Sequence, residues 1–494
     1  IGLSEDGSTV VYALKDDPFT MVELYSASAD ASGSPVLLET FLASDTERLE
    51  TDWGQLRLDT TGTRVLYLTE DDTQAEPVHR LYSLLTDGSG APVELNAPLP
   101  VGASGVNSSF WFGPDGQWVH YEADQTVAGE VELWTVPADR STPPTRAHPQ
   151  LTSDETLGRD WFVGDRIVVE VRNTLAEYDR LYSAPLDGSS SPIRLDDGGA
   201  TSQISSVLPT PNGDRLLYTN DVTTDNEYEF YSVPVDGSAA PLRLSAPGSG
   251  VFGPWLSDDG TIAVYRADPD DGFTAHFKLF SIPVEGGART ILTPPLDTSV
   301  TCPGTAFTGV CGVRVGGSSV LYEATPQSGP GGIHTVPVTG GSPTLLSTER
   351  FADVALRGKR FPGSSTPPTI LLWPYDSRQE LYRVSYDGSL PPALLTADHT
   401  PESCTCIESP IPLGDGSRVV YLQRTPDNQD KLFIADDGRH EIVAPDTTPR
   451  VQEGDTVLIP VRLSQATVES VQVDVAVTGG TAGGADLDFF TSSL

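Results

Sequence analysis

A fifteen-residue pattern that returns through most of the chain is the feature that most restricts the fold. The stretch "LYSAPLDGSSSPIRL" begins at Leu181, and "FYSVPVDGSAAPLRL" begins at Phe230. In each copy an apolar run reaches a turn that contains glycine and a second short run follows, which is typical of a β-hairpin. The chain is therefore a repeat protein. The copies begin at Leu24, Leu81, Leu133, Leu181, Phe230, Leu279, Ile333, Leu381 and Leu432.

A second motif precedes each hairpin. "TPNGDRLLYT" begins at Thr210 and "SDDGTIAVYR" at Ser257, and in each a turn leads into a run rich in β-branched and aromatic residues. A further short segment, such as "SSFWF" before Gly113, stands ahead of most of these turns. Four strands in about 50 residues without a helical period are typical of a propeller blade. Because the first of the nine copies lacks most of its leading strand, we predict an all-β protein with a β-propeller of eight or nine four-stranded antiparallel blades.

These motifs resemble the TolB-like propeller repeats, which are WD-like units of bacterial periplasmic and secreted proteins. The resemblance rests on the "PDG" turn at Pro114, the apolar strand after it, the "YSVPVDG" segment and its closing "RL", and it covers residues 1–445. One departure is the proline that recurs in the third strand, as at Pro185 and Pro234. Because proline has no N–H to donate, we predict that it lies at a bulge or an unpaired position.

The sequence pattern changes after the last copy of the repeat. From Thr448 the segments "VQEGDTVLIPVRLS" and "GGTAGGADLDF" resemble the first part of a Calx-beta domain, a β-sandwich of extracellular and membrane-associated proteins. The predicted domains are thus a propeller at residues 1–445 and a partial C-terminal β-sandwich at residues 446–494. A complete sandwich has about 100 residues, so we expect the chain to end inside this domain.

The Calx-beta resemblance implies one cofactor, calcium, with Glu453 and Asp486 as the matching ligands. However, Gly479 stands where the family often has an aspartate. Calcium takes about six to eight oxygen ligands, which two carboxylates cannot supply alone. The alternative is that both acids are ordinary loop residues at a solvated end of the sandwich, and no other cofactor is predicted.

The charge balance excludes one class of partner. The chain has 69 Asp and Glu against 30 Lys and Arg, a formal net charge of -39, so nucleic acid would be repelled. Acidic loops near Glu70, Asp221 and Asp268 occupy the same place in their repeats. We expect them to form a solvated acidic rim, with a weak divalent-ion site as the alternative.

The cysteines indicate an oxidising compartment. Cys302, Cys311, Cys404 and Cys406 form an even, local set without zinc-like spacing. We expect Cys302 to pair with Cys311, whereas a bridge within Cys404-Thr-Cys406 would be strained, so pairing between the two groups remains open. No apolar run approaches the ~20 residues of a transmembrane helix, and the first residues carry no signal peptide. The predicted location is extracellular, at the cell surface or periplasmic.

No linear catalytic motif is present, because the sequence contains neither G-x-S-x-G nor H-E-x-x-H. His120 and His334 lie in strand motifs where other copies have apolar residues or tyrosine, which indicates packing. Trp111 and Trp255 fall in the leading segments, and we expect core packing for them as well. The chain is therefore predicted not to be an enzyme.

The resulting hypothesis is a non-enzymatic secreted or cell-surface protein that acts by protein binding or assembly through a rigid propeller scaffold. Its predicted partners are other proteins or copies of itself. One alternative is a structural subunit of an extracellular filament or surface layer, in which copies of the chain assemble into a polymer. A second alternative is a secreted carbohydrate-active hydrolase with its site in the propeller channel.

Overall fold

The structure is a computed structural model that describes residues 1–348 with short gaps, residues 382–389, and the backbone of isolated strands between residues 369 and 441. Within this described part the protein contains strands and no helix, which confirms the all-β prediction. The gaps before residue 348 are 17–20, 31, 43, 51–55, 72, 74–75, 174, 176, 200–201, 223–226, 269–275 and 303–307.

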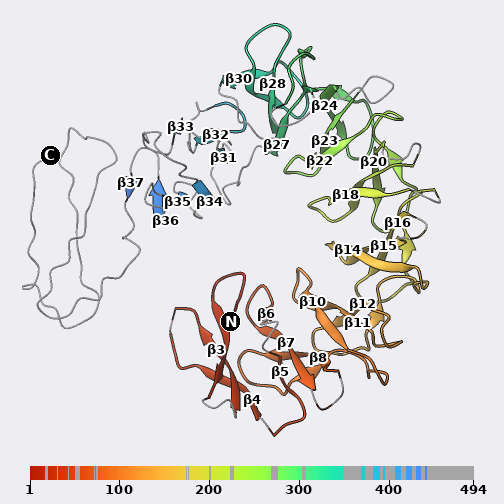
Figure 1. Ribbon diagram of the computed structural model, residues 1–494, viewed down its shortest axis with the longest axis vertical. Coiled ribbons are helices and arrows are strands. Elements are labelled where there is room, and N and C mark those ends of the chain that lie inside the picture. Colours follow the sequence, from red (N-terminus) through yellow and green to blue (C-terminus); the bar gives the residue numbers. More distant parts are fainter. Residues whose placement is uncertain are drawn as a thin grey trace, which may run out of the picture. The chain divides into compact units, whose positions relative to one another are not determined.

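The described strands form nine sheets that follow one another in chain order (Figure 1). The first three sheets contain β1 (Gly2–Leu3), β2 (Thr9–Lys15), β3 (Met21–Ser28), β4 (Val36–Leu42); β5 (Arg48–Leu49), β6 (Arg57–Leu58), β7 (Arg64–Asp71), β8 (Val78–Leu85), β9 (Val93–Glu94); and β10 (Val106–Phe112), β11 (Trp118–Ala123), β12 (Glu132–Pro137), β13 (Thr145–Arg146). The next three contain β14 (Glu155–Val163), β15 (Arg166–Asn173), β16 (Tyr178–Pro185), β17 (Ile193–Arg194); β18 (Ile204–Pro209), β19 (Arg215–Asn220), β20 (Glu229–Pro234), β21 (Leu242–Arg243); and β22 (Phe252–Leu256), β23 (Ile262–Ala267), β24 (His276–Pro283), β25 (Thr290–Ile291), β26 (Thr308–Gly309).

The last three sheets contain β27 (Gly312–Gly316), β28 (Ser319–Ala324), β29 (Gly332–Pro337), β30 (Thr344–Ser347); β31 (Thr369–Leu372), β32 (Tyr382–Ser385), β33 (Ala393–Leu394); and β34 (Ile407–Pro412), β35 (Val419–Arg424), β36 (Asp430–Ala435), β37 (His440–Glu441).

Each sheet has the meander order of a propeller blade, in which consecutive strands are hydrogen-bonded neighbours. Two sheets carry an addition: in the second sheet both β5 and β6 pair with β7, and in the sixth sheet β26 pairs in parallel with β24. The predicted hairpins are present, as at Gly188, whose φ of 65° suits a residue without Cβ and whose amide donates to the Pro185 carbonyl. The repeated sequence therefore folds into a multi-blade β-propeller.

The recurring prolines end the third strands. Pro185 and Pro234 are the last residues of β16 and β20. The carbonyl of each accepts the amide of the turn glycine, at 3.1 Å from Gly188 and 3.0 Å from Gly237. Proline is therefore tolerated at the point where the ladder passes into the turn, rather than at a bulge.

Two compact units divide the chain: Ile1–Leu356 with Ser385–Pro391, and Arg357–Val384 with Pro392–Leu494. The first unit contains the first seven sheets, and a cluster of buried apolar side chains fills each junction between consecutive ones. From the second to the seventh sheet the strand that begins with Arg64, Trp118, Arg166, Arg215, Ile262 or Ser319 supplies much of this core, because most of its side chains are buried on both faces. The boundary predicted between residues 445 and 446 lies outside the described residues. Tyrosines at one repeated position of the second strands are almost fully buried: Tyr67, Tyr121, Tyr218, Tyr265 and Tyr322.

The first strands of neighbouring sheets contact one another. In the first unit β1 contacts β6, β6 contacts β10, β18 contacts β22, and β22 contacts β27. We call these first strands the inner strands, since the inner strands of a propeller line its axis. Within the described part of the chain, no helix has the length and apolar character needed to cross a membrane.

Candidate functional site

A β-bulge interrupts the pairing of inner strands at the same place in several sheets. The register shifts between Leu157 and Asp160 of β14 and between Ile204 and Val207 of β18, and β10 and β22 have the same feature. A bulge removes backbone groups from the ladder and turns side chains in new directions. Bulges along the inner strands therefore favour these strands as the place for a site.

Polar side chains on the second strand bind the groups that the bulges release. The Arg159 amide donates to Glu170 Oε2 at 3.1 Å, and the Ser206 amide donates to Thr219 Oγ1 at 3.0 Å. Both acceptors stand at the same repeated position, the fifth residue of their strand. A polar residue is buried at this position because it accepts a hydrogen bond from a backbone amide that the bulge leaves out of the ladder.

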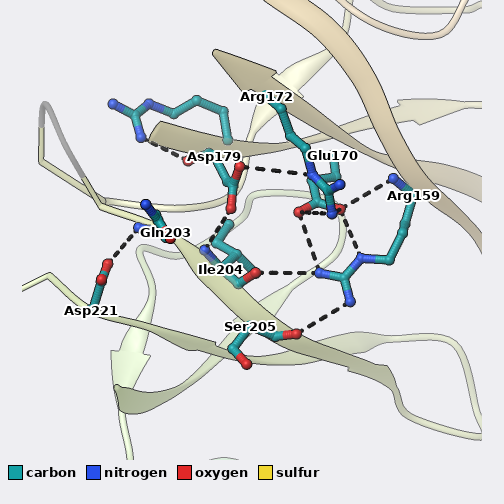
Figure 2. Close-up of polar contacts among 9 residues, drawn as sticks. Arg159, Glu170, Arg172, Asp179, Gln203, Ile204, Ser205 and Asp221 are labelled. Carbon is teal, nitrogen blue, oxygen red and sulfur yellow. Dashed lines mark hydrogen bonds and ion pairs between the residues drawn. The ribbon is translucent and has the colours of Figure 1, made fainter. Parts of the chain in front are cut away.

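Glu170 is the centre of a larger network (Figure 2). Its carboxylate is fully buried and accepts from Arg159 Nε at 2.8 Å and from Arg172 Nη2 at 3.0 Å. Burial alone would raise the pKa of Glu170, but the hydrogen bonds from the Arg159 side chain and amide, with the charges of both arginines, outweigh it and lower the pKa. Glu170 therefore stays ionised and holds the bulge.

The same network joins two sheets. Arg159 donates to the carbonyls of Ser205 at 3.3 Å and Ile204 at 3.4 Å, and the Ile204 amide donates to Asp179 Oδ2 at 2.9 Å (Figure 2). These contacts run from the fourth sheet to β18 of the fifth. Because every group in the network is engaged with the protein, we assign it a structural role.

A second cluster lies where the third sheet meets the fourth. Asp160 of β14 places Oδ2 3.4 Å from Nε2 of His120 on β11. Trp111 stacks on the imidazole with ring centroids 5.5 Å apart, and Phe162 packs against it at 4.7 Å. The guanidinium of Arg57 lies over the Trp111 ring at 4.9 Å. We call Trp111, His120, Glu122 and Asp160 the Asp160 cluster.

The Asp160 cluster combines a buried base with a more accessible acid. The His120 side chain is 5% exposed and that of Asp160 is 28% exposed. Burial lowers the pKa of His120 to about 4, so the imidazole is neutral at neutral pH. Burial, and then the negative charge of Glu122, raise the pKa of Asp160 to about 6. Asp160 can therefore give or take a proton under mildly acidic conditions.

Glu122 is the second carboxylate of this cluster. It lies on β11, two residues after His120, and Oε2 accepts a hydrogen bond from Asn107 Nδ2 at 2.7 Å. Asn107 belongs to the bulged part of β10. The bulge therefore positions Glu122, and the charge of Glu122 acts on Asp160.

A third group of side chains has the spacing of metal ligands. Glu50, Glu70 and His79 of the second sheet place one ligand atom each within 4.8 Å of one another. Carboxylate oxygen and imidazole nitrogen are both metal ligands in proteins. Among the described residues, this group is where a metal ion would fit.

Most of the sequence-predicted site residues cannot be compared with the structure. Glu453, Asp486, Cys404 and Cys406 lie outside the described residues, so the calcium site and half of the cysteine pairing stay predictions. The structure joins Cys302 to Cys311 in a disulfide, which confirms the pairing expected for these two cysteines.

Two expectations from the sequence were wrong. The predicted acidic rim does not hold at Asp221 and Asp268, which are 5% and 2% exposed and accept hydrogen bonds from backbone amides. Trp111 was expected in the core, but it is 39% exposed. In both cases the sequence predicted the position within the repeat, whereas the exposure of the side chain depends on the neighbouring segments.

Sequence reasoning also missed the Asp160 cluster. His120 was interpreted as a packing residue, and Asp160 was not singled out. The departure at His120 from the apolar residues of other second strands was the available signal, since Leu66, Leu217 and Leu321 hold that position elsewhere.

The comparisons with known proteins give a fold rather than a family. No protein family matches the chain, and no curated protein sequence does. Among solved structures, a TolB protein from Agrobacterium tumefaciens is similar at 16% identity and a TM-score of 0.25, over 52% of this chain and 83% of that chain. A puromycin hydrolase mutant in complex with PGG is similar at 16% identity and a TM-score of 0.34, over 66% of this chain and 52% of that chain.

A further match is an oligogalacturonate lyase in complex with manganese, at 11% identity and a TM-score of 0.34, over 87% of this chain and 96% of that chain. At such identities the likeness concerns the fold alone. Two of these similar proteins, a hydrolase and a lyase, are themselves enzymes.

The prediction of a non-enzymatic protein that acts by binding or assembly is contradicted by these neighbours. That prediction depended on the absence of linear catalytic motifs. A propeller can assemble a site from strands of different blades, which are far apart in the sequence, so such a site leaves no linear motif. The absence of one is therefore weak evidence against catalysis.

Proposed function

We propose that the protein is a hydrolase that uses the Asp160 carboxyl as its general acid and base. The observation that carries this proposal is the position of Asp160: on a bulged inner strand, partly exposed, and in contact with the buried imidazole of His120. A carboxyl group in a partly apolar site can remain protonated near the working pH and donate to a leaving group.

Glycosidic bonds are the substrate class that the cluster favours. Such hydrolysis uses two carboxyl groups in different protonation states. Asp160 would be the protonated partner, and Glu122 the ionised one that stabilises developing positive charge. The Trp111 ring stacks on His120 and lies under Arg57, but it is still 39% exposed, so its free part can contact the apolar side of a sugar ring.

The test is a hydrolysis assay on a panel of polysaccharides and chromogenic glycosides at pH 5 to 6. Turnover by the unmodified chain should fall by about 100-fold or more in Asp160→Asn, which removes the proton donor and keeps the shape. Asp154→Asn is the matched control, because Asp154 is exposed just before β14. Failure to hydrolyse any substrate, or full turnover by Asp160→Asn, would refute the proposal.

A location outside the cytoplasm accords with this function. The Cys302–Cys311 disulfide supports an oxidising compartment, since cytosolic thiols are kept reduced. An extracellular or periplasmic hydrolase would meet polymeric glycans there. Cell fractionation would test this, and recovery of the protein in the cytoplasm with reduced cysteines would contradict it.

A further inference from the structure

Three side chains from different segments of the second sheet meet at one point. Glu70 of β7 and His79 of β8 are directly opposite partners across the two strands. Glu50 follows β5, and its amide donates to the Leu68 carbonyl at 2.9 Å, which fixes it beside β7. The sheet register, rather than a flexible loop, therefore brings the three together.

The spacing of the three ligand atoms agrees with a shared metal ion. His79 Nε2 is hydrogen-bonded to Glu50 Oε2 at 3.2 Å, a contact that a bound ion would replace, and all three ligand atoms lie within 4.8 Å of one another. For metal–ligand bonds of about 2.0–2.2 Å, ligand atoms of one ion are separated by roughly 3–4.4 Å. A small closing movement of long side chains is enough to complete the geometry.

Burial distinguishes this group from an exposed acidic patch. The side chains of His79 and Glu50 are 11% and 6% exposed. Glu70 is half-buried, and Arg48 of β5 is its directly opposite partner across the strands. Two carboxylates that are brought together and partly shielded from solvent favour a cation between them.

The backbone of His79 is held in place by the segment that leads into the next sheet. The His79 amide donates to the Ser104 carbonyl at 2.9 Å, and the Gly105 amide donates to Asp124 Oδ1 at 2.8 Å. A Cβ on Gly105 would stand 2.1 Å from the His79 carbonyl oxygen, so only glycine permits this approach. The backbone of His79 is therefore fixed before any ligand binds, which lowers the entropy cost of binding.

We propose that Glu50, Glu70 and His79 bind a transition-metal dication of the Mn²⁺ or Zn²⁺ class. The imidazole selects against Ca²⁺ and Mg²⁺, which prefer oxygen ligands alone. Three protein ligands leave coordination positions for water or a substrate oxygen. The site is separate in its residues from the Asp160 cluster and from the predicted calcium ligands Glu453 and Asp486, so it adds a metal function to the proposed hydrolysis.

Isothermal titration calorimetry of the full chain with MnCl₂, ZnCl₂ and CaCl₂ tests the proposal. We expect one equivalent of Mn²⁺ or Zn²⁺ to bind, with Ca²⁺ at least about tenfold weaker. Glu70→Gln should weaken Mn²⁺ binding by at least about tenfold. Glu94→Gln is the matched control, because Glu94 is an acid of the same sheet whose Oε1 lies 3.8 Å from Arg80 Nε, and it should bind normally.

Electron spin-echo modulation of the unmodified chain with bound Mn²⁺ makes the result independent of how the variants fold. Coupling to an imidazole nitrogen supports the His79 ligand. Absence of nitrogen coupling, absence of binding, equal Ca²⁺ affinity, or an equal loss in both variants would each overturn the assignment.

Discussion

Asp160 is held in an environment that opposes its charge. Its pKa is raised to about 6 by burial and by Glu122, whereas a free aspartate has a value of 3.8. A raised carboxyl pKa means that the folded state binds a proton more tightly than the unfolded state. The charged form therefore costs stability at neutral pH, and the cost disappears as the pH falls through 6 toward 4.

The raised pKa of Asp160 predicts that this carboxyl group lowers the stability of the protein while it provides the activity. At pH 7.5 Asp160→Asn should raise the free energy of unfolding by roughly 2 kcal/mol, because the neutral amide carries no charge to bury. Below pH 4 the difference should vanish, since Asp160 is then protonated as well. Urea unfolding at both pH values measures it, and a variant that is less stable at pH 7.5 would contradict the assigned environment.

A second prediction concerns His120. Three other second strands, β7, β19 and β28, hold leucine at this position. His120→Leu should therefore keep the fold and change the free energy of unfolding by less than about 1.5 kcal/mol. Loss of the imidazole removes the polar neighbour of Asp160 and should shift the alkaline limb of the pH–rate profile, where the general acid Asp160 loses its proton. Comparing the pH–rate profile with the unfolding curve separates a change in activity from a change in stability. An unfolded variant, or an unchanged profile, would count against this role.

At the scale of single residues, little of the site could be predicted from the sequence. His120 and Asp160 belong to different sheets, and no sequence spacing relates residues that meet across a blade junction. Cys302 and Cys311 were easier, because both lie within one short segment. Pairing within a segment is visible in a sequence, whereas contact between repeats requires their stacking geometry.

At the scale of elements, the repeat predicted strands and turns but not bulges. The Asp-Gly turns follow from backbone freedom at glycine, which is a local property. A bulge depends on the register between two strands, and the buried Glu170 is intelligible only once the Arg159 amide is known to need an acceptor. The sequence therefore predicted the hairpins, but it did not predict the bulges of the inner strands.

The bulge of β14 should depend strongly on Glu170. Glu170→Ala leaves the Arg159 amide without its acceptor and two guanidinium groups without their shared partner, so unfolding should become about 2–3 kcal/mol easier. Asp187→Asn, at an exposed turn of the same sheet, is the control and should change stability by less than about 0.5 kcal/mol. Equal effects of the two changes would show that Glu170 does not hold the bulge.

Gly105 offers a test of the contact between the second and third sheets. Gly105→Ala would place a Cβ 2.1 Å from the His79 carbonyl oxygen, whereas a Cβ on Gly102, which has a φ of 85°, would meet no atom within 4 Å. Both glycines have positive φ, so Gly102→Ala measures the backbone strain alone, about 1 kcal/mol. Gly105→Ala should cost clearly more and should also weaken Mn²⁺ binding. Equal unfolding energies would remove the steric argument.

At the scale of the whole molecule, the propeller fold could be predicted because the same pattern was repeated. Each sheet buries its faces against its neighbours, and one hydrophobic cluster per junction is the structural result. The proposed extracellular setting and the Calx-beta resemblance beyond residue 445 had no such redundancy. They stay predictions, as do the partner proteins suggested by the sequence.

The net charge of -39 acts on the molecule as a whole. Like charges repel across the surface, and the Debye length falls from about 30 Å at 0.01 M to about 8 Å at 0.15 M salt. Exposed ion pairs are weakened by the same screening, but partly buried ones such as those of Glu170 are weakened less. Repulsion therefore dominates, and the melting temperature should rise by a few degrees between 0.01 M and 0.15 M NaCl. Tetramethylammonium chloride at equal ionic strength should give the same rise, because screening does not depend on the identity of the cation. A melting temperature that falls with salt would mean that exposed ion pairs, rather than net repulsion, decide the electrostatic part of the stability.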